Sequence, residues 1–205
     1  MSTDTKPLLD TASFLSTGWS QEIKLTFNTR DAILYALGVG AEEPEFVYEC
    51  DENFAVLPTL PFALCFRGDA NDVLPFPPAA SSALGPLPPN VGLKALDYRR
   101  RIELFRPLPH PGAAGVCCAL QGRPRSVLVR KAGVVVEYET TMSIVDHQDG
   151  QESSSLICRM HSATFLLGAR ATESAGNMML TTPVAFPSFP PDFSTEQILH
   201  PSYVK

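Results

Sequence analysis

The feature that most constrains the fold is a change of hydrophobic period near Leu93. Before it, two short apolar segments are bounded by capping residues and predict helices. After it, segments rich in Val, Ile, Tyr and Thr predict strands. The predicted strands are Tyr98–Phe105, Gly115–Leu120, Ser126–Val129, Val134–Ile144 and Ser155–Leu167, separated by turns at Pro107–Gly112, Gln121–Pro124 and Asp146–Gly150. Helices followed by antiparallel strands favour an α+β fold, with a sheet wrapped on a buried helix.

The first predicted helix begins at Asn28 or Thr29, either of which can cap it by accepting a backbone N–H. Asp31 falls in the first turn, where the helix dipole favours a negative charge. The segment Ala32–Leu37 is apolar on every face, which predicts a buried helix. Gly38 suits the left-handed position that ends many helices.

The second predicted helix is Leu60–Phe66, which is also apolar all round and is expected to be buried. Pro61 suits its first turn and Gly68 its end. Between the two helices, weak alternation over Glu45–Glu49 predicts a short strand. The proline-rich stretch 68–92 is interpreted as a long loop within one domain.

We predict three segments along the chain. Residues 1–22 form a weakly ordered N-terminal arm that Trp19 pins to the body. Residues 23–186 form the domain, with a last strand at Leu180–Phe186. Residues 187–205 form a proline-rich exit and tail.

Composition narrows the functional classes. A net charge of −6 argues against nucleic-acid binding, and the absence of an 18-residue apolar run argues against a membrane span. Five irregularly spaced cysteines indicate reduced thiols in an intracellular protein. The start of the chain lacks the pattern of a secretory signal, and the final residues are not a peroxisomal address.

Three stretches in register resemble one family. They are Ala32–Ala41, the segment from Phe46 through Leu57-Pro58-Thr59, and Ile102–Pro109. All three are similar to the start of the hydratase 2 domain of peroxisomal multifunctional enzymes, a branch of the MaoC-like dehydratases. The resemblance covers roughly residues 20–192. It implies a hot-dog fold, a peroxisomal setting and (R)-specific 2-enoyl-CoA hydration in fatty-acid β-oxidation.

The resemblance also implies an acyl-CoA site. It places Asp97 and Tyr98 beside the ligand, although relatives have His-Gly there, and it places basic residues at the turn of Arg130 and Lys131. From the residues alone, a solvated hairpin tip is the favoured explanation of the basic pair. Likewise, Phe62, Leu64 and Phe66 are expected either to line an acyl-chain pocket or to belong to the plain core.

The resemblance also exposes what the sequence lacks. In this family an Asp and a His in a motif close to Asp-x-Asn-Pro-Leu-His move the proton, and no such motif occurs here. We therefore expect no catalytic residue, no cofactor and no metal ligand set. The first hypothesis is the substrate-binding half of a hydratase, a lyase, paired in a homodimer or with a partner hot-dog half. The alternatives are a non-catalytic acyl-CoA-binding or interaction module and, more weakly, a hot-dog thioesterase.

Three charged or titratable groups have simpler explanations. Alternation places Arg99 and Arg101 on one face of their strand and Arg100 on the other, where they can protect an edge or grip phosphates. His161, within a strand, is expected to be a hydrogen-bonded structural residue. His147 lies in a polar turn between two carboxylates.

Overall fold

The computed structural model describes residues 8–67, 95–112, 114–148, 151–177 and 179. Three predicted features lie outside these residues: the loop at 68–92, the last strand at Leu180–Phe186, and the proline-rich exit and tail at 187–205.

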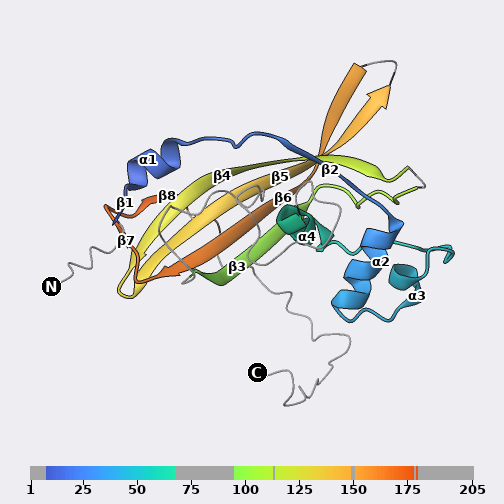
Figure 1. Cartoon of the computed structure of the whole chain (residues 1–205), viewed down its shortest axis with the longest axis horizontal. Helices are drawn as coiled ribbons and strands as arrows, with labels where there is room; N and C mark the ends of the chain where they lie inside the picture. Colours follow the sequence, from blue (N-terminus) through green and yellow to red (C-terminus); the bar gives the residue numbers. More distant parts are fainter. Residues whose placement is uncertain (1–7, 68–94, 113, 149–150, 178, 180–205) are drawn as a thin grey trace, which may run out of the picture.

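One antiparallel sheet forms the body of the molecule (Figure 1). Its strands run in the order β2-β4-β5-β6-β3, and the short β8 joins the free side of β4. They are β2 (Ile23–Phe27), β3 (Ala95–Leu104), β4 (Val116–Arg130), β5 (Gly133–Gln148), β6 (Gln151–Leu167) and β8 (Ala175–Gly176). With α4 (Leu60–Arg67) packed against this sheet, the α+β hot-dog prediction is confirmed.

The predicted turn at Gln121–Pro124 is wrong, because β4 runs through it without interruption. The pairing of β4 with β5 shifts register between Pro124 and Ser126, so Arg125 is an extra residue in a bulge. Proline has no N–H to donate to a ladder and is tolerated at bulges. The sequence signals that indicate a turn therefore mark a bend within one long strand.

Helix α2 (Thr29–Gly38) begins as predicted, since Asn28 and Asp31 form a reciprocal capping box. The prediction that it is buried on every face is wrong. Only its alanines are fully buried, whereas Leu34 and Leu37 are 60% and 55% exposed. The left-handed residue after the helix is Gly40, with φ +85°, rather than Gly38.

The predicted strand at Glu45–Glu49 is also wrong, because α3 (Pro44–Val47) forms there. Pro44 occupies the first turn of this helix, where its fixed φ is favourable and its missing N–H is not needed. Glu45 adds a negative charge at the same end.

Residues 8–22 are more ordered than the expected arm. They form β1 (Leu8–Leu9), which pairs with β7 (Arg170–Ala171), and α1 (Thr11–Ser16), which Asp10 caps. Phe14 of α1 packs edge-on against Tyr138 of β5, with ring centroids 5.7 Å apart. Trp19 stacks on Arg123 at 4.3 Å, as its predicted pinning role requires.

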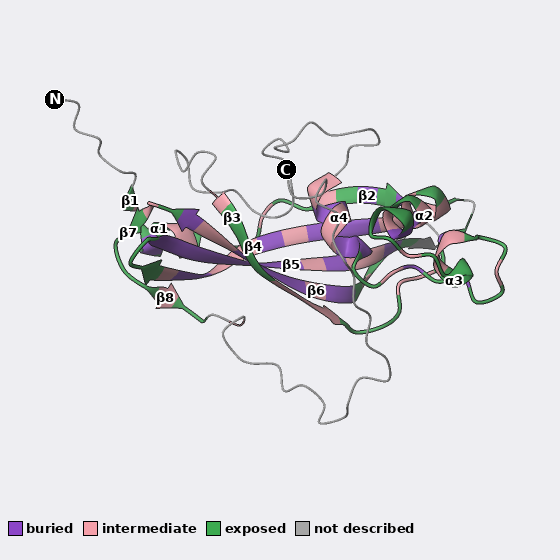
Figure 2. Cartoon of the chain, turned by 90° about the horizontal axis from the view of Figure 1, so that it is seen from below, coloured by how far each residue is buried: buried purple, intermediate pink, exposed green. Residues whose placement is uncertain are grey.

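The main core lies between α4 and the sheet (Figure 2). Leu60, Leu64 and Cys65 are buried there, while Phe62 and Phe66 are only half-buried, so α4 is not buried all round as predicted. Met142 and Met160 face α4 from the central strands. No helix in the described ranges is long and apolar enough to cross a membrane.

Candidate functional site

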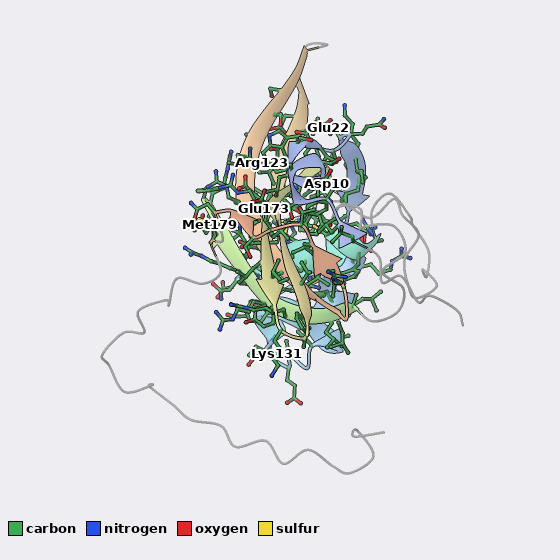
Figure 3. All side chains as sticks on the ribbon, turned by 90° about the vertical axis from the view of Figure 1, so that its left-hand side faces the viewer. Asp10, Glu22, Arg123, Lys131, Glu173 and Met179 are labelled. Atoms are coloured by element: carbon green, nitrogen blue, oxygen red, sulfur yellow. The ribbon has the colours of Figure 1, made fainter. Side chains whose placement is uncertain are left out.

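Two pairs of predicted ligand residues lie at one end of the sheet. Arg130 is paired with Gly133 across the β4–β5 hairpin, and Lys131 occupies its tip, as Figure 3 shows. Leu166 of β6 pairs with Val134 on one side and with Ala95, the first residue of β3, on the other. Only β6 therefore separates the hairpin from the start of β3, where Asp97 and Tyr98 lie.

Asp97 has a structural partner that alternation alone would not predict. Its Oδ2 accepts a hydrogen bond from Arg100 Nε at 2.8 Å. The register of β3 against β6 shifts between Asp97 and Arg99, so a bulge at Tyr98 brings Asp97 and Arg100 together. Tyr98 itself is half exposed, with the Arg99 guanidinium 5.5 Å from its ring.

Arg100 connects this end of the sheet to α4. Its guanidinium lies 5.3 Å from the ring centroid of Phe62 and 5.0 Å from that of Phe66. Such stacking is favourable, more so where water is partly excluded. The aromatic side of α4 is thus capped by a cation that Asp97 holds in place.

The three predicted acyl-pocket residues divide into two groups. Phe62 and Phe66 lie under Arg100 at the surface of α4, whereas Leu64 is buried within the main core. Leu64 therefore fits the plain-core alternative, whereas the two rings are only half-buried beneath the Arg100 guanidinium.

Arg67 fixes the end of α4 that lies beyond this cluster. Its Nη1 is 3.0 Å from Asp31 Oδ2 on α2, and its Nη2 donates to the Thr26 carbonyl on β2. These contacts hold α4 against two other elements, so its aromatic side keeps a defined position.

A buried acid–base couple lies on the other face of the sheet. Glu137 of β5 and His161 of β6 are 0% and 1% exposed, with Oε1 and Nδ1 3.5 Å apart. The Glu137 carboxylate also accepts from the Ser126 hydroxyl at 3.3 Å and from the Met179 N–H at 3.2 Å. Because Met160 faces α4, its neighbour His161 points away from it.

The prediction that His161 is hydrogen-bonded is wrong, since neither ring nitrogen has a hydrogen-bond partner. Sequence reasoning missed Glu137 altogether. The sequence feature that could have indicated it is a pair of carboxylates two residues apart, Glu137 and Glu139, in a largely apolar strand.

No metal site is formed by the part of the chain that the structure describes, where no group of three or more His, Cys, Asp or Glu residues could hold an ion. Asp149 and Gly150 of the predicted polar turn lie outside that part. Asp51, one of two upstream carboxylates considered for thioesterase chemistry, accepts from the Asn53 N–H within a turn.

The buried thiols provide a chemical test of this core. Burial raises the pKa of Cys118 and of Cys158 to about 12, and raises the pKa of Cys65 further. Because the thiolate is the reactive form, we expect these three thiols to resist a disulfide reagent at neutral pH, with reactivity appearing only as the pH approaches those values. Exposed Cys50 should react first.

Mass spectrometry after timed labelling measures this order of reaction. All five thiols should react at similar rates in denaturant, which provides the control. Native labelling of Cys65, Cys118 and Cys158 as fast as that of Cys50 would contradict the packing of α4 on the sheet.

Comparison with known proteins gives one matching family model, described as the MFE-2 hydratase 2 N-terminal domain, over residues 25–168. The chain is 31% identical over 136 residues to the probable dehydratase NIT22 of Ajellomyces capsulatus, covering 63% of this chain and 35% of that protein. It is 29% identical over 178 residues to the peroxisomal multifunctional enzyme type 2 of Mus musculus, covering 82% and 21%. The chain thus spans about a third or less of these curated relatives.

Solved structures agree on the fold. A crystal structure of a MaoC-like dehydratase from Phytophthora capsici superposes with a TM-score of 0.71 and 28% identity, covering 90% of this chain and 59% of that one. The full-length peroxisomal multifunctional enzyme type 2 of Drosophila melanogaster gives a TM-score of 0.53 at 24% identity, covering 84% and 26%.

Proposed function

The chain belongs to the MFE-2 hydratase 2 N-terminal domain family, and from this premise we propose that it is the substrate-binding half of a MaoC-like (R)-specific 2-enoyl-CoA hydratase. In this proposal it binds the acyl-CoA thioester and contributes no group to proton transfer. The chemistry is supplied by a partner hot-dog half.

The observation that carries the proposal is the arrangement at one end of the sheet. Arg130 and Lys131 lie at a hairpin tip one strand away from the start of β3. Phosphate oxygens of coenzyme A are ligands that such basic side chains bind well. Phe62 and Phe66 of α4 offer apolar surface next to β3, where an acyl chain can lie.

Asp97 contributes indirectly in this scheme. Its carboxylate is already engaged by Arg100, so it positions a cation over the aromatic side of α4 rather than facing a phosphate. Relatives have His-Gly where this chain has Asp97 and Tyr98. We assign Asp97 the role of holding Arg100 at the border of the apolar surface of α4.

Two observations support the absence of proton-transfer chemistry. The sequence contains no Asp-x-Asn-Pro-Leu-His motif. Among the described residues, the buried acid–base couple of Glu137 and His161 lies on the face of the sheet opposite α4 and is closed to solvent. A substrate bound beside Phe62 would be separated from it by the sheet.

Two named relatives are peroxisomal multifunctional enzymes, and we propose the same compartment and a role in fatty-acid β-oxidation for this protein. The occupant of the site would then be an enoyl-CoA or a 3-hydroxyacyl-CoA.

Calorimetric titration tests the proposed ligand class. We expect decanoyl-CoA to bind more tightly than either coenzyme A or decanoate alone, because only the thioester engages both the basic tip and the apolar surface. Equal affinity for decanoate and decanoyl-CoA would contradict the role of the basic tip. Release of free coenzyme A during the titration would instead favour the thioesterase alternative.

A further inference from the structure

The sheet face opposite α4 carries a row of charges that the proposed site does not use. We call it the arginine belt. It consists of Arg123 and Arg125 on β4, Glu139 on β5, Arg159 on β6, and Arg101 and Glu103 on β3. Register explains the row, since Arg123 pairs with Glu139, Glu139 with His161, and His161 with Arg101.

The belt has more positive than negative charge. Glu139 lies 3.0, 3.3 and 3.8 Å from three arginines, and Glu103 lies 2.6 and 3.8 Å from Arg101 and Arg159. Four guanidinium groups thus share two carboxylates. The Nε atoms of Arg123, Arg125 and Arg159 are buried without a hydrogen-bond partner, as are both ring nitrogens of His161.

An exposed aromatic ring flanks the belt at each edge. Trp19, 42% exposed, stacks on Arg123 at 4.3 Å, and Phe105, 52% exposed, lies 5.5 Å from the Arg159 guanidinium. Tryptophan, arginine and exposed aromatic rings are the residues that concentrate binding energy in protein interfaces. A surplus of positive charge selects an acidic partner surface.

Such a surface exists on this same chain, around α3. We call it the acidic knob. Its carboxylates lie within eleven consecutive residues that include no lysine or arginine: Glu42, Glu43, Glu45, Glu49, Asp51 and Glu52. Within the part of the chain that the structure describes, none of these carboxylates forms an ion pair. Leu34, Leu37 and Tyr48, each more than half exposed, add apolar surface.

We propose that the arginine belt of one copy of this chain binds the acidic knob of a second copy. The belt crosses four strands, about 14 Å at the usual strand spacing, which an extended segment of about four residues can span. Helices α2 and α3 lie at the lower right in Figure 1, to one side of the sheet, so a knob can reach another molecule. In a two-fold dimer each belt meets the other copy's knob.

Charge exchange between two variants tests this pairing. The belt variant Arg101→Glu/Arg159→Glu has a negative belt and a negative knob. The knob variant Glu42→Lys/Glu45→Lys/Glu49→Lys/Glu52→Lys, altered at four exposed positions, has a positive belt and a positive knob. The homodimer dissociation constant of each variant alone should be at least about tenfold above that of wild type. An equimolar mixture of the two variants should form a heterodimer, because both belt–knob contacts are again of opposite charge.

Sedimentation velocity of the full chain at low salt and at about 1 M salt, where the screening length is about 3 Å, provides the measurement. Wild type should be dimeric at low salt and shift toward monomer at high salt. Arg170→Glu, at an exposed position that takes no part in the ion pairs of the belt, is the control and should associate like wild type.

Three results would overturn the proposal: a wild type that is monomeric at every salt concentration, variants that associate unchanged, or a mixture that stays monomeric. If the belt variant fails to unfold cooperatively, Trp19→Ala/Phe105→Ala replaces it. That variant leaves Glu139 paired and should also weaken the dimer; unchanged association would again overturn the proposal.

Discussion

Replacing Arg130 and Lys131 together by alanine is expected to weaken decanoyl-CoA binding by about thirtyfold. Both side chains are at a solvent-exposed hairpin tip, so each phosphate contact is screened and contributes about 1 kcal/mol. Two such contacts sum to about 2 kcal/mol, and each 1.4 kcal/mol corresponds to a factor of ten. Calorimetric titration of wild type and variant with the same ligand measures the difference.

The control for this experiment is Arg170→Ala, which replaces an exposed arginine of β7. It removes one positive charge from β7, which contacts β4 and β5, but leaves Arg130 and Lys131 in place, so its affinity for decanoyl-CoA should equal that of wild type. Raising the salt concentration should reduce the difference in decanoyl-CoA affinity between wild type and the double variant, because salt screens the phosphate contacts. If the double variant binds as tightly as wild type, the basic tip is only a solvated turn.

The second large effect is expected from Gly133→Ala, which should lower the free energy of unfolding by about 3 kcal/mol. A Cβ at Gly133 would lie 2.2 Å from the Leu166 carbonyl oxygen and 3.1 Å from its carbon. These are backbone atoms of β6, so neither can move aside without separating β5 from β6. Glycine is required here by close approach of two strands rather than by its φ.

Gly38→Ala provides a control with the opposite sign. Gly38 is the last residue of α2 and has no atom within 4 Å of its added Cβ. Alanine there should be neutral or stabilise by up to about 1 kcal/mol, because it reduces the entropy of the unfolded chain. Urea unfolding measures the free energy of unfolding of both variants. Equal values for the two would contradict the described β5–β6 register.

Local signals predicted local structure well. The N-terminal cap of α2 could be predicted from the sequence, because the capping box needs only Asn28 and Asp31, three residues apart. The resemblance and the period-two strands were enough for the hot-dog fold. The continuity of β4 could not be predicted, because Gly and Pro residues such as Gly122 and Pro124 occur both in turns and in bulged strands.

The site was predicted only in part, for a related reason. The hairpin that carries Arg130 and Lys131 follows from two adjoining strands. The Asp97–Arg100 contact depends on a bulge, which shifts side chains to the other face without any change in residue pattern. The burial of Glu137 involves residues outside its own strand, Ser126 on β4 and Met179, which alternation does not consider. A polar residue in a strand is expected from alternation alone to face solvent.

The central claim is that this chain binds a thioester but does not move a proton, and a hydration assay tests it most directly. Purified chain should bind trans-2-decenoyl-CoA while the absorbance of the enoyl thioester stays constant, as in a sample without protein. Turnover by wild type that disappears in Glu137→Gln and His161→Gln variants would contradict the claim, because it would make the buried couple a working acid and base.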